Sequence, residues 1–135
     1  MKIFLDACII IYWIESAEPF HSKLATRLHK IAETHPKHTL NISRLSLLEC
    51  LVKPTREKDK KTLSLYQAFF EASDLAIIEI DAIVVDMATK LRANHNLRTP
   101  DAIQAASCLS MDEKHVFLTN DKRLSSIANL HTVLL

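Results

Sequence analysis

The sequence predicts an α/β fold in three layers, α/β/α, with a mainly parallel central sheet and one domain over residues 1–135. Three observations favour this class. Short apolar segments typical of buried strands alternate with longer segments whose apolar residues recur at helical spacing. The chain has 135 residues, and 48% of them are hydrophobic, which is enough to fill a core. Glycine is absent, where average usage gives about nine residues, and this favours helices joined by short connections.

Five segments have the length and apolar character of strands. The first, KIFLD, is a short buried strand that runs directly into a helix. The second, TLNIS, alternates apolar and polar residues, which is typical of a strand with two different faces. The expected strands cover residues 2–6, 39–43, 75–80, 115–119 and 132–135.

The segments between these strands predict helices. The helix RLSLLECLV is expected to stop before Pro54, because proline lacks the backbone donor that a helix needs. Asp81 is expected to cap the helix that follows it. Thr99 is the expected cap of a later helix, since Pro100 suits the first helical position. The expected helices run from the first strand through Ile14, over 19–35, 44–52, 62–73 and 81–96, from Pro100, and from Asp121 or Lys122.

Composition narrows the classes of function. The formal net charge of +1 gives no strong overall attraction for nucleic acid, so an anionic partner must be held by local charge or by metal. The absence of glycine excludes a phosphate-binding loop, a dinucleotide-binding fingerprint and a G-x-S-x-G nucleophile elbow. Three cysteines without C-x-x-C spacing favour a reducing cytoplasm over a disulfide framework. The longest uncharged apolar run, residues 7–14, is too short to cross a bilayer, so no membrane partner is expected.

Four acidic residues are expected at one edge of the sheet. Asp6 ends the first strand, Glu49 lies on the helix after the second strand, and Asp121 follows the fourth. Asp101 begins a helix whose N-terminus can turn to the same edge. Because ligand sites in open α/β sheets lie beyond the carboxyl ends of the strands, we expect these carboxylates to form a site.

Each acid also has a purely structural interpretation. Asp6 could be a turn residue at a strand end, and Asp121 could cap a helix after a turn. Ser46 and Glu49 fit a capping box of the form S-x-x-E. Asp101 could stabilise the exposed N–H groups at the start of its helix. The joint placement of four acids at one edge favours a site over four independent structural roles.

Carboxylates that gather in this way need a counter-charge. Two of them about 4 Å apart repel by about 4 kcal/mol at an effective dielectric constant of about 20. Four therefore cannot all stay ionised without a cation. Hard oxygen ligands select Mg²⁺ or Mn²⁺, whereas the seven scattered histidines give no zinc-binding spacing. A divalent cation held by carboxylates is suited to phosphate chemistry.

Four segments occur in a fixed order along the chain: IFLDACIIIYWI, SRLSLLE, LRTPDAIQAA and FLTNDKRL. With these segments the sequence resembles the PIN-domain ribonucleases, especially the VapC-type toxins of bacterial toxin–antitoxin pairs. The resemblance spans nearly the whole chain. It implies a Rossmann-like PIN fold and Mg²⁺- or Mn²⁺-dependent endonuclease action on RNA. It further implies a homodimer and a small antitoxin protein that obstructs the acidic pocket.

The resemblance also assigns roles to individual residues. The sequence departs from the family at Ala7 and Cys8, where Thr or Ser is usually followed by a small polar residue. We therefore expect weaker support of Asp6 by neighbouring side chains, and with it a lower metal affinity. The residues that match the family are the catalytic and metal-binding acids Asp6, Glu49, Asp101 and Asp121, with Thr119 and Asn120 as their polar neighbours.

Basic and aromatic residues are candidates for contacts with RNA. The basic run at 53–61 is better explained as the solvated start of a helix. Aromatic residues make up only 6% of the chain, so we expect them in the core or in an interface rather than stacked on bases. The basic residues near the acids, and therefore the expected phosphate contacts, are Arg98, Lys122 and Arg123. The aromatic candidates are Tyr12, Trp13, Phe69 and Phe70.

These observations predict a metal-dependent endoribonuclease that acts in the cytoplasm as the toxin of a toxin–antitoxin pair. Two alternatives stay open. One is a PIN-like module that binds RNA or protein and has lost catalysis, and the other is a structure-specific DNA nuclease with the same acids. Mg²⁺ binding separates the first alternative from the enzyme, and matched RNA and DNA substrates separate the second.

Overall fold

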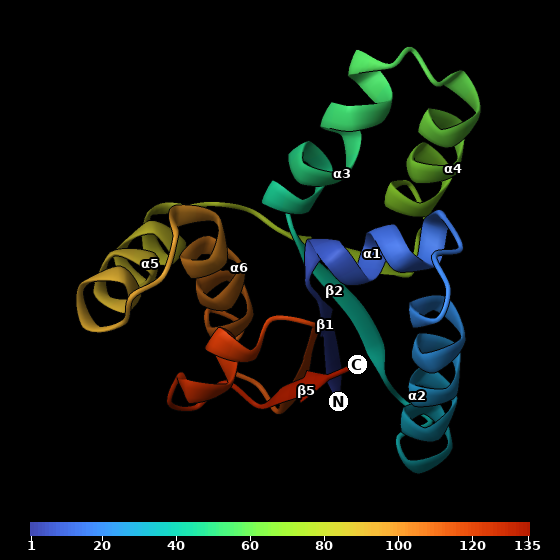
Figure 1. The fold of residues 1–135 in the computed structure, drawn as a ribbon. Helices are drawn as coiled ribbons and strands as arrows, with labels where there is room; N and C mark the ends of the chain where they lie inside the picture. The colour runs from blue at the N-terminus through green and yellow to red at the C-terminus, as the bar shows by residue number, and fades with distance from the viewer.

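A five-stranded parallel sheet forms the middle layer of the molecule (Figure 1). The computed structural model describes residues 1–135. The strands lie in the order β3-β2-β1-β4-β5, and every neighbouring pair is parallel, where the sequence predicted a mainly parallel sheet. The strands are β1 (Lys2–Leu5), β2 (Thr39–Ser43), β3 (Leu75–Ile78), β4 (His115–Thr119) and β5 (Thr132–Leu134).

Six α-helices and a 3-10 helix connect the strands and cover both faces of the sheet. The helices are α1 (Ala7–Ile14), α2 (Phe20–Thr34), α3 (Leu45–Arg56), α4 (Lys60–Phe70), α5 (Ala82–Asn94), α6 (Thr99–Leu109) and η1 (Lys122–Ser126). Helices α1 to α4 pack on one face, and α5, α6 and η1 pack on the other. Figure 1 shows the α3–α4 hairpin extending away from the sheet at the top of the view. The predicted three-layer architecture is confirmed. None of the helices combines the length and the apolar character needed to cross a bilayer.

Side chains along each strand point alternately to the two faces of the sheet, so that a separate hydrophobic core forms on each face. In β1, Ile3 and Leu5 pack with α1 to α4, whereas Phe4 between them packs with α5 and α6. Phe4 also stacks on Phe117 of β4, with ring centroids 5.3 Å apart. Burial of a large apolar side chain stabilises a fold by about 1.5–3 kcal/mol. Because β1 contributes to both cores, it is fixed at the centre of the sheet.

Helices α3 and α6 differ from the predicted boundaries for identifiable reasons. Helix α3 continues through Pro54 to Arg56 instead of stopping before the proline. Pro54 lies in the last turn, where the missing N–H removes only one hydrogen bond of the helix. Helix α6 begins at Thr99, so Arg98 rather than Thr99 holds the capping position. The Thr99 hydroxyl instead accepts a hydrogen bond of 2.8 Å from Arg92 on α5.

Two other helices are started by aspartate caps. Helix α4 covers residues 60–70 rather than 62–73, because the side chain of Asp59 caps its N-terminus. The predicted cap at Asp81 is confirmed by a hydrogen bond of 2.9 Å from the backbone N–H of Val84. These caps satisfy donors that the first turn of a helix would otherwise leave without partners.

The parallel arrangement brings the carboxyl ends of β1, β2 and β4 to one edge of the sheet. Asp6 directly follows β1 and caps α1, while Asp121 follows β4 and caps η1. Glu49 lies on α3, the helix that follows β2. Since β1 lies between β2 and β4, these three acids come from adjacent strands. Asp101 lies in the first turn of α6.

The absence of glycine leaves other residues to form the left-handed turns. Aspartate and asparagine tolerate such a backbone. Two of the observed residues, Ser16 and Lys58, belong to types without that tolerance, and a left-handed backbone costs such residues about 1–2 kcal/mol. The residues with positive φ are Ser16 (51°), Lys58 (55°), Asp112 (49°) and Asn129 (67°).

Lys58→Gly is therefore expected to stabilise the fold by about 0.5–1 kcal/mol. Relief of the left-handed strain should exceed the extra entropy that glycine loses on folding. Urea unfolding of the two proteins measures the difference. Lys58→Ala removes most of the same side chain but keeps Cβ, so its stability should stay close to that of the wild type. Equal stabilisation by both substitutions would contradict the strain.

Candidate functional site

The four predicted acids line one pocket at the carboxyl edge of the sheet. The pocket has a volume of about 260 Å³ and is formed by α1, α3, the start of α6 and the residues after β1 and β4. Its lining residues are Asp6, Ala7, Cys8, Tyr12, Glu49, Arg98, Asp101, Asn120 and Asp121. The structure therefore places the four acids, Asn120, Arg98 and the aromatic candidate Tyr12 around a single hollow.

Asp6 is held at the centre of this edge by two hydrogen bonds. One carboxylate oxygen accepts the backbone N–H of Ala7 at 2.8 Å, and the other accepts the hydroxyl of Thr119 at 2.7 Å. Burial raises the pKa of Asp6 to about 6, although both hydrogen bonds lower it. The charges of Glu49 and Asp101 raise this pKa further. Asp6 therefore gives up its proton less readily than an exposed aspartate does.

Thr119 links Asp6 to Asp121. Its hydroxyl donates to Asp6 and accepts the backbone N–H of Asp121 at 3.1 Å. The neighbouring Asn120 donates from its amide to the hydroxyl of Tyr12 at 3.3 Å. Tyr12, expected in the core or in an interface, is half-buried and lines the pocket. Thr119, at the end of β4, thus holds Asp6 in place. Asn120, the next residue, holds the Tyr12 side chain that forms one wall of the pocket.

Asp6 keeps two hydrogen-bond donors despite the unusual pair Ala7 and Cys8. The backbone N–H of Ala7 and the hydroxyl of Thr119 occupy the two carboxylate oxygens. The Cys8 thiol lies 3.8 Å from the oxygen that Thr119 contacts. Burial raises the pKa of Cys8 to about 12, and the charge of Asp6 contributes, so the thiol stays neutral. The backbone N–H of Ala7 and the hydroxyl of Thr119, which is far from Asp6 in the sequence, therefore donate the hydrogen bonds to Asp6. Such bonds were expected from side chains directly after Asp6.

Glu49 is oriented by Gln104, a residue that the sequence interpretation missed. Gln104 lies on α6 three residues after Asp101 and is only 2% exposed. Its amide donates to Glu49 Oε1 and to the hydroxyl of Ser46, both at 3.0 Å. These contacts replace the capping box considered for Ser46 and Glu49, since α3 already begins at Leu45. The sequence signal that could have identified Gln104 is its position in an otherwise apolar stretch of helix, three residues after Asp101.

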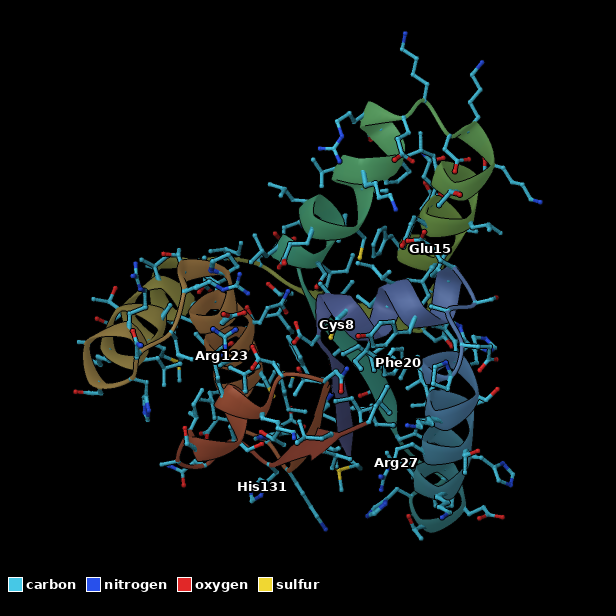
Figure 2. The ribbon with its side chains drawn as sticks, in the orientation of Figure 1. Cys8, Glu15, Phe20, Arg27, Arg123 and His131 are labelled. Carbon is cyan, nitrogen blue, oxygen red and sulfur yellow. The ribbon has the colours of Figure 1, made fainter.

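Asp101 and Asp121 are both paired with arginines. Arg123 donates from Nη2 to Asp121 at 2.5 Å and to Asp101 at 3.2 Å, and Figure 2 labels its position beside α6. Arg98 donates from Nε to Asp101 at 3.1 Å. The hydrogen bonds from Arg123 lower the pKa of Asp121. Two of the three basic residues expected to contact RNA thus contact the acids, and Lys122 is exposed.

The donor chemistry of the pocket matches a hard divalent cation. All four acids offer carboxylate oxygens, and the only cysteine that lines the pocket is a neutral thiol. As they stand, the side chains do not form a group of three or more metal ligands. Arg123 instead holds Asp101 and Asp121 in ion pairs. The Arg123 guanidinium is therefore the counter-charge that these two carboxylates share in this structure.

Comparisons with known proteins give one domain family and similar solved structures. The family model described as PIN domain matches residues 3–130. A chain in the crystal structure of VapBC2 from Rickettsia felis, bound to a DNA fragment from their promoter, has 21% identity and a TM-score of 0.78. The match covers 100% of this chain and 99% of that chain. A chain in a toxin–antitoxin complex from Klebsiella pneumoniae has 19% identity and a TM-score of 0.71, covering 97% of this chain and 95% of that one. A comparison with curated proteins gives no match.

The raised pKa of Asp6 makes the stability of the metal-free protein depend on pH. The folded carboxyl, with a pKa of about 6, holds a proton to higher pH than the unfolded one, whose ordinary pKa is 3.8. This group therefore lowers stability as the pH rises from about 4 to about 7. Asp6→Asn removes the titration, so the variant should gain up to about 3 kcal/mol over the wild type at neutral pH.

Urea unfolding in EDTA across this pH range measures the difference. The matched control is Asp74→Asn, an exposed aspartate before β3 at the opposite edge of the sheet, which should follow the wild type. A stability gap between Asp6→Asn and the wild type that stays constant with pH would show that buried charge is not its cause.

Proposed function

The chain belongs to the PIN-domain family, and on this premise we propose that it is a metal-dependent endoribonuclease that hydrolyses RNA phosphodiester bonds. One observation carries the proposal: Asp6, Glu49, Asp101 and Asp121, far apart in the sequence, line a single pocket. Such a gathering of carboxylates is unfavourable for the stability of the protein and favourable for binding a divalent cation.

Mg²⁺ or Mn²⁺ is the proposed cofactor. Asp6, Asp101 and Asp121 would hold the ion, and Glu49 would be a further ligand or the group that orients water. When bound, such an ion activates water and neutralises the charge that develops on the leaving oxygen. Ion binding would be accompanied by loss of the proton from Asp6 and by release of the carboxylates from Arg123.

The side chains around the acids have distinct parts in this proposal. Gln104 holds Glu49 through Oε1, which leaves Glu49 Oε2 free to orient a water or to accept its proton. The buried Oε1 of Gln104 has no partner and can itself accept a hydrogen bond from water. Arg98, Lys122 and Arg123 are exposed and would contact phosphate groups of the substrate.

The proposed biological role is that of the toxin in a toxin–antitoxin pair, active as a homodimer and restrained by a cognate antitoxin. Both similar solved structures described above come from toxin–antitoxin systems. The isolated chain also exposes large apolar side chains on three helices, and apolar side chains exposed in a patch are typical of surfaces that bind proteins. The most exposed are Leu48 and Val52 on α3, Leu65 on α4, and Ile83 and Val85 on α5.

RNA in the cytoplasm is the proposed substrate. All three cysteines are free, which supports action in a reducing compartment. The presence of all four acids in one pocket favours the enzyme over a binding module that has lost catalysis. Because the acids address the phosphate, a group that RNA and DNA share, matched oligonucleotides of the two kinds test the RNA assignment.

Asp101→Asn is expected to reduce RNA cleavage by about a hundredfold or more, because the amide keeps the shape of the side chain but loses the charge that attracts the cation. The measurement is cleavage of a mixed-sequence RNA oligonucleotide in Mg²⁺. Excess EDTA should abolish cleavage by the wild type. Asp112→Asn makes the same chemical change in an exposed turn outside the pocket and should cleave RNA as the wild type does.

Thermal unfolding followed by circular dichroism shows whether Asp101→Asn keeps its fold. Undiminished cleavage by the folded variant, or by the wild type in EDTA, would overturn the metal-dependent mechanism. Cleavage of the matched DNA at the same rate as the RNA would overturn the substrate assignment and leave the nuclease assignment in place.

Arg123→Ala is expected to strengthen Mg²⁺ binding by about threefold to tenfold, because it removes the cation that competes for Asp101 and Asp121. Titration calorimetry in the absence of RNA measures the change. Arg44→Ala removes an arginine that pairs with Glu79 outside the pocket, so its Mg²⁺ affinity should equal that of the wild type. Unchanged or weaker binding by Arg123→Ala would contradict the competition.

A further inference from the structure

Helix α2 carries three exposed basic side chains that have no acidic partner. Lys23, Arg27 and Lys30 share one face of the helix over an axial rise of about 10 Å. With Thr26 and Leu135 they line a hollow of about 330 Å³. None of the three forms a salt bridge. We call these three residues the α2 basic row.

Two stacked aromatic rings connect the acidic pocket with the α2 basic row. Tyr12 lines the pocket and stacks on Phe20, with ring centroids 4.4 Å apart. The Nζ atom of Lys23 lies 6.0 Å from the centre of the Phe20 ring. In Figure 2, Phe20 lies between Cys8, at the pocket, and Arg27, in the row. A series of contacts therefore runs from the wall of the pocket to Lys23, the first residue of the row.

A backbone contact also places the hollow beside the pocket. Leu135, which lines the hollow, donates its N–H to the carbonyl oxygen of Thr119 at 3.2 Å. Thr119 ends β4 and contacts Asp6, which lines the pocket. Leu135 thus brings one side of the hollow to the carboxyl end of β4, beside the pocket, and the α2 basic row continues from there along α2.

The α2 basic row adds unpaired positive charge to that of Lys122, a basic residue beside the acids that forms no salt bridge. At the pocket, Arg98 and Arg123 are already paired with Asp101 and Asp121. The formal net charge of the chain is only +1, so no overall field attracts a polyanion. A substrate whose phosphate must approach carboxylates therefore needs attraction from unpaired cations nearby. The row is such a group, and the aromatic rings join it to the pocket.

We propose that the α2 basic row binds the sugar–phosphate backbone of the single-stranded RNA whose scissile bond lies in the acidic pocket. The inference rests on the proposed ribonuclease function. Cations in a row bind phosphates whatever the base, and aromatic faces support a nucleotide between two such contacts. Tyr12 and Phe20 occupy that intermediate position. The row extends recognition to nucleotides that flank the cleaved bond, without a preference for sequence.

The test compares the wild type with K23A/R27A/K30A. Alanine favours helix, so α2 should keep its fold in the variant. Binding of single-stranded RNAs of about three to about twelve nucleotides is measured by fluorescence anisotropy in EDTA. The wild type should gain affinity with length. The variant should bind the longest RNA about tenfold more weakly, with a salt dependence shallower by about 2 in the log–log slope. The shortest RNA should bind equally to both proteins.

The matched control is K58A/K60A/K61A. These lysines lie around the tip of the α3–α4 hairpin, which Figure 1 shows extending away from the sheet. The control loses the same number of positive charges as the variant of the row. It should bind the longest RNA as the wild type does, because its charges lie outside the path from the pocket to α2.

Three outcomes separate this inference from the proposed function. Equal binding of long RNA by K23A/R27A/K30A and the wild type overturns the role of the row. Equal weakening by both triple variants also overturns it, because the effect would then be one of total charge. If binding depends on length and on the row but Mg²⁺ produces no cleavage, the row is supported and the ribonuclease function is overturned.

Discussion

Repulsion between carboxylates at the carboxyl edge of the sheet is the constraint on which the rest of the structure depends. Parallel strands that end side by side, with the first turn of α6, bring four acids to one pocket. Ionised carboxylates about 4 Å apart repel by about 4 kcal/mol at an effective dielectric constant of about 20. The chain offsets this repulsion in two ways. Asp6, whose pKa is raised first by burial and then by the charges of Glu49 and Asp101, holds its proton more tightly, and Arg123 bridges Asp101 and Asp121.

Local patterns were sufficient to predict the sheet and the edge on which the acids lie. Apolar periodicity identified the strands, and the helices between them required parallel pairing. Once a strand end is located, Asp6 and Asp121 follow from their position in the chain. The wrong predictions concern helix ends at which the surrounding structure overrides a rule based on the local sequence. Pro54 is tolerated because it lies in the last turn of α3, and Thr99 bonds to Arg92 on another helix.

The internal arrangement of the site was not predictable in the same way. Gln104 reaches Glu49 only because α6 packs beside α3, and no spacing within either helix reveals that contact. Arg123 is selected by proximity to the acids in the sequence, yet its hydrogen bond to Asp101 depends on how η1 meets α6. The support of Asp6 by Thr119 likewise crosses from one strand to the next. In each case the partner lies on a different element.

The guanidinium of Arg123 is a positive counter-charge for Asp101 and Asp121 that is part of the protein chain itself. A newly synthesised molecule can therefore reach its native state with Asp101 and Asp121 already paired. Under the proposed function, activation would be an exchange of this guanidinium for a divalent cation. The free concentration of that cation would then set the fraction of molecules that are ready to act.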